Sequence, residues 1–461
     1  MSRRMRWQTR RHLKNSCALL LCALVMAQSA LVLAGGFNNF RNPSVGGISI
    51  NVYGVVAEPL KSDRNKLLKK LREEIGKAPQ DLNAPTGLRM ISLRGLEAAI
   101  EDAHVNNLGK LPDEVQFLAG LQRIEYVFLY PEANDIVIAG PGDGWRIDEK
   151  ANVVGLTTGR PIILLDDLLV AFRNARNAAQ GHGISCSIDP TAEGRQKLNA
   201  YLAKQTTFNR GIPAGVERAL GPQQVSITGV PADSHFARVM VAADYQMKRF
   251  AMDLEAAPVK GMPSFVDMMA AKRAKLGNMM PRWWLACNYE PVARSEDGLA
   301  WQLRGNGVKA MTEDDFISAA GAAKGTGRAN PMAQQWADTM TEKYDELTAK
   351  EPIFGELRNL MDLCVVAALI ERHHLLDEVN LDLPLIRGSK KGLSIDKWLP
   401  PKTIATQCSF QKVGREYIIT ASGGVQVESW AVARETEMSA DVEQVRTRAK
   451  AVDKKNWWWN S

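Results

Sequence analysis

The chain has 461 residues, 45% of them hydrophobic and 24% charged, and a formal net charge of +7. Six basic residues and no acidic residue lie in the first 34 positions, so residues 35–461 carry a net charge of +1. A nearly neutral chain lacks the basic surface expected of a nucleic-acid-binding protein, and we expect no nucleic-acid partner.

The first 34 residues have the layout of a secretory signal peptide, with a basic head, an apolar run and small residues at the exit. Val32 and Ala34 are small enough for the −3 and −1 positions of a signal-peptidase site, which predicts cleavage between Ala34 and Gly35. Because the apolar run approaches the roughly 20 residues that span a bilayer, an uncleaved N-terminal membrane anchor is the alternative. The stretch "TRRHLKN" leaves both the general and the twin-arginine export routes open. Either route predicts an exported protein of the periplasm or the extracellular space.

Strand and helix patterns alternate through the first half of the remaining chain. A segment rich in Gly and Asn at 35–47 predicts a flexible lead-in. Hydrophobic spacing then predicts a strand at 48–57, helices at 63–75 and 92–107, a hairpin at 124–140, and strand–helix pairs at 160–179 and 183–205.

The stretch "IVIAGPGDGW", residues 136–145, is the most enzyme-like part of this half because three glycines follow an apolar run. A dinucleotide-binding loop needs G-x-G-x-x-G between a strand and a helix, and these glycines have a different spacing. Pro141 also removes one backbone amide that could bind an anion. We therefore expect a turn between sheet segments that binds no nucleotide.

The second half mixes longer helices with β-rich runs. Asp233 or Ser234 is expected to begin an amphipathic helix, and Asn330 and Pro331 have the residue types preferred at the start of another. The run at 363–370 is apolar on all sides, which predicts the most buried helix. The remaining predictions are a strand at 223–230, a β-meander at 282–311, a linker at 321–330 and further strands at 403–410 and 416–429.

Together these patterns predict the α+β class, with two mixed α/β lobes, antiparallel hairpins and amphipathic helices. We place the boundary between the lobes near 211–221, where Gly flanks a short segment. The predicted organisation is a signal peptide at 1–34, the lead-in at 35–47, an N-terminal mixed α/β domain at 48–215, a C-terminal α+β domain at 216–453 and a tryptophan-rich tail at 454–461.

The sequence contains no familiar catalytic or metal-binding motif. H-E-x-x-H and G-x-S-x-G do not occur, and Ser394 with Lys397 match S-x-x-K without a companion K-T-G. The cysteines beyond the signal have no zinc-site spacing, and their pairing stays open: Cys186, Cys287, Cys364 and Cys408. We predict no catalytic, cofactor-binding or metal-binding residue and no cofactor.

Several polar pairs have structural interpretations. The histidines of "ERHH", residues 371–374, are typical of the last turn of a helix, where positive charge is favourable. Asp233 and His235 are interpreted as a helix cap and its neighbour rather than an acid–base pair. Asp244 and Lys248 lie four apart on a predicted helix, which predicts a surface ion pair.

Two groups of tryptophans are candidates for partner binding. Trp283 and Trp284 would point to opposite faces of a strand, so that one lies in the core and the other offers a surface platform to a ligand. Trp457, Trp458 and Trp459 cannot all be buried on one face, so at least one should face outward. That tail either folds back onto the body or docks on an envelope partner or a membrane surface.

Three stretches, at 118–145, 237–252 and 294–316, read "LAGLQRIEYVFLYPEANDIVIAGPGDGW", "ARVMVAADYQMKRFAM" and "RSEDGLAWQLRGNGVKAMTEDDF". In these three stretches the sequence resembles the secreted planctomycete proteins of the domain of unknown function 1598 family. The resemblance places the named domain at the hairpin region 118–145. It implies export and a bacterial envelope context, and it implies no reaction, cofactor or catalytic residue.

Two hypotheses for the function follow. The favoured one is a non-catalytic binding or scaffolding module of the bacterial envelope, with an unknown envelope component or protein as partner. The alternative is an envelope hydrolase whose catalytic residues come from distant segments, because catalytic geometry often has no local sequence signature.

Overall fold

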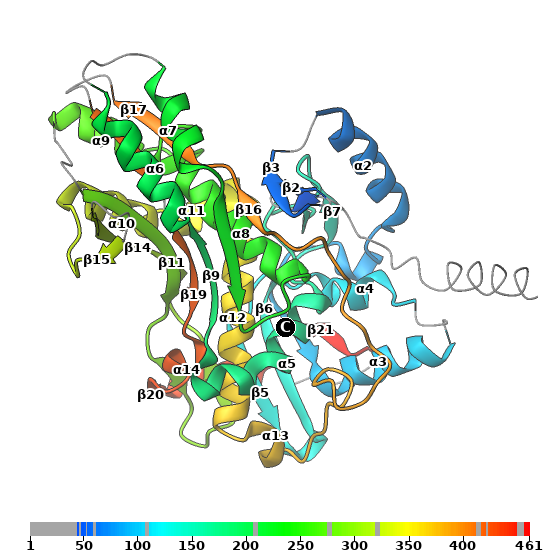
Figure 1. Ribbon diagram of the computed structural model, residues 1–461. Coiled ribbons are helices and arrows are strands. Elements are labelled where there is room, and N and C mark those ends of the chain that lie inside the picture. The colour runs from blue at the N-terminus through cyan, green and yellow to red at the C-terminus, as the bar shows by residue number, and fades with distance from the viewer. Residues whose placement is uncertain are drawn as a thin grey trace, which may run out of the picture. The chain divides into compact units, whose positions relative to one another are not determined.

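The computed structural model describes residues 44–45, 48–51, 53–58, 61–106, 110–205, 211–273, 279–318, 323–411, 416–420, 423–449 and 456–461. Residues 42–461 form one compact unit, to which all these segments belong. Its elements are α-helices and mixed sheets, as the α+β prediction requires (Figure 1). The predicted signal peptide and its cleavage site at Ala34 and Gly35 lie outside the described residues.

The larger sheet has both parallel and antiparallel pairs. Its strands lie in the order β1 (Ser44–Val45), β2 (Ile48–Ile50), β3 (Val55–Ala57), β16 (Thr403–Ile404), β10 (Gln223–Thr228), β9 (Ile184–Asp189), β19 (Gly423–Val427), β11 (Met279–Asn288), β14 (Gly307–Ile317) and β15 (Ala323–Gly325). The central strands therefore come from three distant parts of the chain.

The smaller sheet contains the predicted hairpin, whose strands pair from Tyr126 with Ala139 to Tyr130 with Asp135. Its order is β20 (Thr436–Met438), β12 (Val292–Arg294), β13 (Ala300–Gln302), β5 (Tyr126–Tyr130), β6 (Asp135–Gly142), β4 (Thr86–Ser92) and β21 (Trp458–Asn460). Separate two-stranded ladders join β7 (Trp145–Ile147) to β8 (Val153–Gly155), and β17 (Gln407–Gln411) to β18 (Glu416–Thr420).

The helices cover the sheets and fill the space between them. They are α2 (Lys61–Glu74), α3 (Leu93–Asn106), α4 (Asp113–Gln116), α5 (Leu165–Asn177), α6 (Ala192–Ala203), α7 (Ile212–Leu220), α8 (His235–Ala251), α9 (Phe265–Lys272), α10 (Pro331–Glu342), α11 (Tyr344–Lys350), α12 (Pro352–Arg372), α13 (Leu375–Glu378), α14 (Ser429–Val432) and α15 (Ala440–Ala449). Short 3₁₀ helices lie at Gln80–Leu82, Leu118–Gly120 and Pro131–Ala133, and a π-helical turn lies at Ala178–His182.

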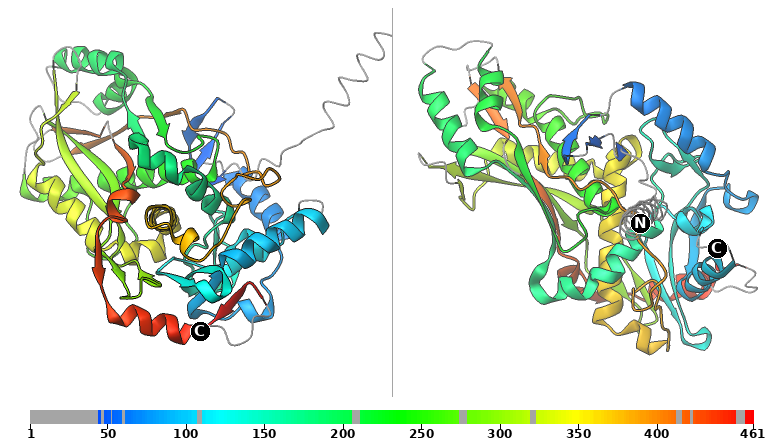
Figure 2. Two further views of the ribbon diagram at one scale, coloured as in Figure 1. Left: turned by 90° about the horizontal axis from the view of Figure 1, so that it is seen from below. Right: turned by 45° about the vertical axis from the view of Figure 1, so that its right-hand side comes forward.

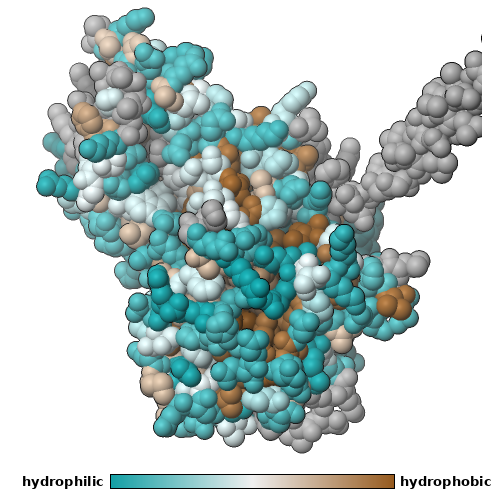
Figure 3. All heavy atoms as spheres, turned by 60° about the horizontal axis from the view of Figure 1, so that its bottom comes forward, coloured by the Kyte–Doolittle hydropathy of each residue, from teal (hydrophilic) through white to brown (hydrophobic). Residues whose placement is uncertain are grey.

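Helix α12 lies at the centre of the molecule, surrounded by other elements (Figure 2). Every residue from Pro352 to Ile370 is buried, which confirms the prediction for the apolar run at 363–370. Figure 2 shows this helix end-on in the middle of its left view, with other elements around it. Hydrophilic residues cover most of the face seen in Figure 3, with patches of hydrophobic residues between them. Among the described residues, no helix is both long and apolar enough to cross a membrane.

Two predicted helix starts are confirmed by their capping bonds. The Ser234 hydroxyl accepts a hydrogen bond from the Ala237 amide at the start of α8, at 3.1 Å. The Asn330 side-chain oxygen accepts one from the Met332 amide at the start of α10, at 2.8 Å. Each cap satisfies an amide that has no partner within its helix.

The glycine run is different from the expected turn. Gly140 and Gly142 lie within strand β6, and the chain turns only after them. A side chain at Gly140 would place its Cβ 2.2 Å from the carbonyl oxygen of Arg123. The expected turn between sheet segments is therefore shorter than predicted: it lies at Asp143 and Gly144, between β6 and β7, whereas Gly140 lies in the strand where neighbouring backbone approaches closely.

Other local predictions also differ from the structure. The expected single strand at 48–57 is a hairpin of β2 and β3, and the expected strand before α5 is reduced to an isolated bridge at Pro161. The expected meander at 282–311 is divided: β11 and β14 pair in the larger sheet, whereas β12 and β13 pair in the smaller one.

Strands from the predicted domains 48–215 and 216–453 share both sheets, and in the larger one they are interleaved. In the larger sheet β9 lies between β10 and β19, and in the smaller sheet β5 pairs with β13. The expected boundary region contains helix α7, whose residues 212–220 pack against α6.

Candidate functional site

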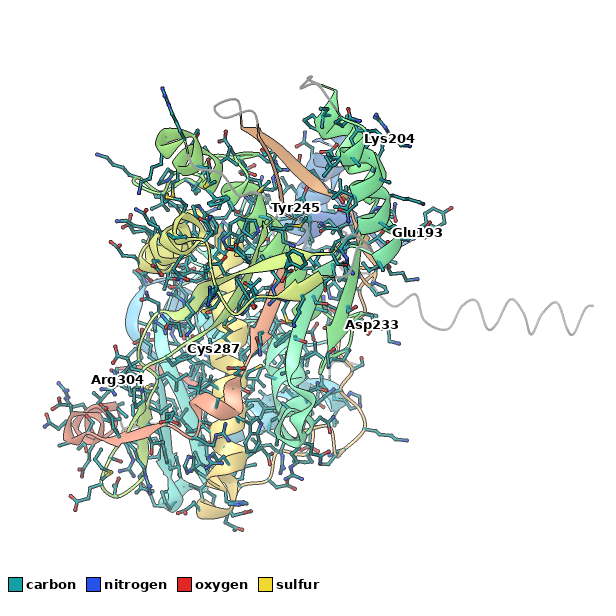
Figure 4. The ribbon with its side chains drawn as sticks, turned by 60° about the vertical axis from the view of Figure 1, so that its left-hand side comes forward. Glu193, Lys204, Asp233, Tyr245, Cys287 and Arg304 are labelled. Carbon is teal, nitrogen blue, oxygen red and sulfur yellow. The ribbon has the colours of Figure 1, made fainter. Side chains whose placement is uncertain are left out.

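The candidate site is a groove over one face of strands β9, β19 and β11, in the middle of the larger sheet. Its volume is about 760 Å³, within the ~300–1,000 Å³ of typical ligand sites. In Figure 4, Glu193 and Lys204 mark α6 above this part of the sheet, and Cys287 marks the lower part of β11. We call this hollow the sheet groove.

Alternation along the strands creates the two faces of this sheet. In β9, Ile184, Cys186 and Ile188 are buried on the inner face, whereas Ser185 and Ser187 alternate with them and line the groove. On β11, the same alternation buries one tryptophan and leaves the next one partly exposed. The groove is therefore lined largely by the more exposed half of each strand.

Trp283 and Trp284 take the opposite faces that the strand pattern predicts. Trp283 has no exposed surface and packs edge-on against the rings of Phe265 and Trp336, at centroid distances of 5.1 and 5.6 Å. Trp284 is partly exposed and lines the sheet groove. Its role in binding stays a prediction.

Trp284 is held in place by its neighbours on the same face. The guanidinium carbon of Arg282 lies 5.1 Å from the centroid of the Trp284 ring, a cation–π contact. Arg282 in turn forms an ion pair with Glu313 of β14, at 2.6 Å, directly across the strand pair. This chain of contacts fixes the indole before any ligand arrives.

A second indole lies at the end of the groove, on α14. Trp430 donates its Nε1–H to the carbonyl oxygen of Ala175, at 2.8 Å, and its ring remains partly exposed. The exposed Gln426 lies nearby on β19 and donates to Glu428, at 2.8 Å. Both are groove residues that sequence reasoning missed, since nothing local links them to Trp284.

The floor of the groove is the glycine pair of β19. A Cβ at Gly424, where φ is +149°, would lie 1.9 Å from the carbonyl oxygen of Cys186 on β9. A Cβ on the other side, at Gly423, would lie 2.5 Å from Cε of Lys248. Only glycine fits between the two neighbouring elements here, so the floor stays low and free of side chains.

A buried ion pair lies beneath this floor, on α8. Asp244 and Lys248 are 2.8 Å apart and are 0% and 3% exposed, so the expected surface ion pair is wrong. The reason is that α8 packs into the core with nearly its whole circumference. Burial raises the pKa of Asp244, and the ammonium of Lys248 opposes that rise. Burial also raises the pKa of the free Cys186 thiol well above its ordinary value, which makes it a poor nucleophile.

A second buried cluster joins α5, α8 and α12. His235 Nδ1 lies 2.9 Å from a carboxylate oxygen of Asp167, and both side chains are under 9% exposed. Burial acts to lower the pKa of His235, but the charge and hydrogen bond of Asp167, together with neighbouring carboxylates, raise it overall. Burial raises the pKa of Glu356 to about 8. Asp233 instead lies 3.9 Å from Lys397 at the surface. His235 therefore does not merely follow the helix cap: it forms a buried contact between α8 and Asp167 of α5.

The histidines of "ERHH" have separate surroundings. His373 Nε2 lies 3.2 Å from the Ala433 carbonyl oxygen, and the exposed His374 lies 3.7 Å from Asp377. Glu371 forms ion pairs with Arg176 of α5 and with Arg387, which follows α13 in the chain. Within the part of the chain that the structure describes, no group of three or more His, Cys, Asp or Glu side chains is arranged to hold a metal ion.

The tryptophan-rich tail lies along the smaller sheet. Strand β21 pairs with β4 at the edge of that sheet, with Trp458 opposite Ile91. Trp459 donates its Nε1–H to the Ala449 carbonyl oxygen at 3.0 Å, and all three tryptophans of the tail are partly exposed. The tail folds back on the body, and its contact with a partner or a membrane stays a prediction.

Comparison with known proteins identifies one similar family. Residues 186–265 match the model of a family described as "Protein of unknown function (DUF1598)". The match supports the resemblance seen in the sequence but lies elsewhere, since we expected the named domain at 118–145. No curated protein and no solved structure shows significant similarity to the chain.

The segment matched by the family model contributes directly to the site. It begins at Cys186 on β9, so it includes Ser187 of the groove, and it contains all of α8 with the buried pair below the floor. The rest of the groove lies outside the matched segment and comes from the start of β9, including Ser185, and from β11, β19 and α14.

Proposed function

We propose that the protein is an exported, non-catalytic binding protein of the bacterial cell envelope, and that the sheet groove holds its ligand. The observation that carries the proposal is the position of Trp284, which Arg282 holds on the open face while Trp283 packs in the core. An indole fixed over an open, polar surface is typical of a recognition platform rather than of a core residue.

The chemistry around the groove supports binding over catalysis. Beneath the groove, Cys186 and Asp244 have pKa values raised by burial, and both are buried. The hydroxyls of Ser185 and Ser187 face the groove from β9. Such groups can form hydrogen bonds to a ligand without any acid–base step.

The alternative function, an envelope hydrolase, has one observation in its favour. The contact of His235 with Asp167 has the geometry of a general base oriented by a carboxylate. Both side chains are under 9% exposed, so a substrate would reach them only after the helices around them separate. We therefore favour the binding function.

Export is the part of the proposal that rests on residues 1–34. The exported protein is expected to begin at Gly35, because Val32 and Ala34 fit a signal-peptidase site. N-terminal sequencing of the protein recovered outside the cytoplasm tests this, and a membrane-bound chain that retains residues 1–34 would support the uncleaved anchor instead.

The binding proposal is tested by co-sedimentation with isolated bacterial envelope material. We expect Trp284→Ala to weaken binding at least about tenfold, as for a central aromatic contact, without lowering the melting temperature. Tyr53→Ala is the matched control, since Tyr53 is 78% exposed and lies outside the groove. Wild-type binding by Trp284→Ala would show that the groove is not the ligand site.

A further inference from the structure

The position of the sheet groove restricts how a ligand can be recognised there. Strand β19 pairs with β9 on one side and with β11 on the other, so its backbone groups already have partners. A peptide that extends a sheet needs the unpaired edge of an outer strand. The ligand is therefore held by the side chains that stand on the face of the sheet.

Those side chains are of two kinds. Trp284 and Trp430 offer flat apolar rings, whereas Ser185, Ser187 and Gln426 offer hydroxyl and amide groups. A ligand that satisfies both kinds must itself have flat apolar faces edged by hydrogen-bonding groups. A pyranose ring has this character, because its C–H groups form an apolar face and its hydroxyls point outward around the rim.

The charges of the groove disfavour a phosphate-rich ligand. Arg282 is paired with Glu313, at 2.6 Å, and the groove lining contains both Glu428 and the exposed Arg434. Positive and negative groups are therefore close to balance. Nucleic acids and other polyphosphates require a surplus of cations to replace their counterions, and this groove does not provide one.

The shape and the rigidity of the groove favour a chain of several pyranose rings over a single sugar. The groove is an open trough that continues from β9 across β19 to β11 and α14, with the glycine floor keeping it shallow. Both indoles are fixed in advance, Trp284 by Arg282 and Trp430 by Ala175. Preorganised aromatic rings lose little conformational entropy when a ligand stacks on them.

We infer that the ligand of the sheet groove is an unbranched glycan chain, whose sugar rings stack on Trp284 and Trp430 while Ser185, Ser187 and Gln426 bond its hydroxyls. The inference rests on the proposed function, because it names the ligand class of the same site. Envelope polysaccharides are a source of such chains outside the cytoplasm.

The experiment measures glycan binding to the purified exported protein by titration calorimetry. The probes are hexasaccharides of glucose, of N-acetylglucosamine and of galacturonic acid, with poly-glutamate and single-stranded DNA as ligands of other classes. We expect at least one glycan series to bind more tightly as the chain lengthens from two to six sugars, and to displace the protein from envelope material.

Variants of groove residues then test whether the glycan binds in the sheet groove. Trp284→Ala and Gln426→Ala should each weaken the glycan at least about fivefold with an unchanged melting temperature, whereas Tyr53→Ala should bind as the wild type does. Gln426 is exposed, so its variant tests the groove even if the tryptophan variant folds poorly. Glycan binding that survives both substitutions would overturn the inference.

The same measurements separate this inference from the proposed function. If Trp284→Ala abolishes envelope binding but none of the three glycans binds or competes, the binding function stands and the glycan inference is wrong. Binding of poly-glutamate or DNA that depends on Trp284 would overturn it as well. If the wild-type protein binds no envelope material and no probe, both proposals fail.

Discussion

Ionised side chains lie deep inside this protein, where each needs a partner because removal from water is costly. Asp362 on α12 accepts a hydrogen bond from the hydroxyl of Tyr289, at 2.6 Å, and lies 3.2 Å from Nε of Arg123. Asp244 with Lys248 and Asp167 with His235 are further examples. Such pairs connect helices to the sheets at defined positions, so single substitutions within them should have large effects.

The pair beneath the groove floor gives the first test of this view. Lys248→Met leaves the buried Asp244 without its partner and should lower the free energy of unfolding by about 3–5 kcal/mol. The double variant Asp244→Leu with Lys248→Met should lose clearly less, since no isolated charge remains. Urea unfolding of the three proteins checks this, and a loss below ~1 kcal/mol for the single variant would contradict it.

The pKa of Glu356 predicts how stability depends on pH. Burial raises this pKa from 4.5 to about 8, so between these values the folded chain holds a proton that the unfolded chain has lost. Stability should therefore fall as pH rises, by on the order of 1.4 kcal/mol per pH unit at most, and level off above pH 8. The raised pKa of His235 acts with the same sign, because its stabilisation is lost as pH rises through the folded value.

Glu356→Gln removes the contribution of this carboxyl group to the pH dependence. The variant should match the wild type near pH 5, where Glu356 is neutral in the folded state, and exceed its stability at pH 9. Urea unfolding at pH 5, 7 and 9 measures the difference, with the exposed Glu342→Gln as control. Parallel pH profiles for wild type and Glu356→Gln would rule out this role, since the raised pKa values of His235 and Glu351 would then account for the slope.

Helix α10 shows how a local signal supports a long-range contact. Its cap, Asn330, fixes the first turn, and Trp336 two turns later donates to the Pro263 carbonyl oxygen at 3.1 Å and packs on Trp283. The helix therefore supports the inner face of the strand that carries the groove tryptophan.

Loss of this cap should be measurable in the intact protein. Asn330→Ala removes the acceptor of the Met332 amide and should cost about 1 kcal/mol of unfolding free energy. Asn330→Asp keeps an acceptor and should stay close to the wild type. Denaturant unfolding compares the three, and equal stability of the alanine variant would mean that the first turn is satisfied without the cap.

At the scale of the whole molecule, the C-terminal strand β21 forms one edge of the smaller sheet. Asn460 of β21 accepts a hydrogen bond from Nε of Arg89, at 2.7 Å, and Arg89 has no exposed surface. Burial lowers the pKa of this arginine to about 10, so its bonds to neighbouring oxygens matter. Figure 2 shows the C-terminus beside α15 at this edge.

Deletion of residues 454–461 distinguishes a structural tail from a docking tail. We expect the truncated protein to melt several degrees lower, because a hydrogen bond to a buried cation and an edge strand are lost together. Asn460→Ala should reproduce part of the loss. A truncated protein with an unchanged melting temperature that no longer sediments with envelope material would instead favour docking through the tryptophans.

Features that depend on near neighbours along the chain can be predicted from residue type and spacing alone. The caps at Ser234 and Asn330, the buried helix at 363–370 and the hairpin at 124–140 all follow from local spacing and residue type. The opposite faces of Trp283 and Trp284 follow from the period of a strand in the same way. This is why one tryptophan of the groove could be named in advance.

The pairing of distant strands and the burial of charged side chains depend on long-range packing. The groove needs residues 184–187, 282–284 and 423–430 together, and no local pattern encodes that pairing. The spacing of Asp244 and Lys248 is the same for an exposed and a buried ion pair, so their burial depends on what packs against every side of α8. Periodicity reports which face of an element is apolar, whereas the partner of that face is chosen by the free energy of the whole assembled core.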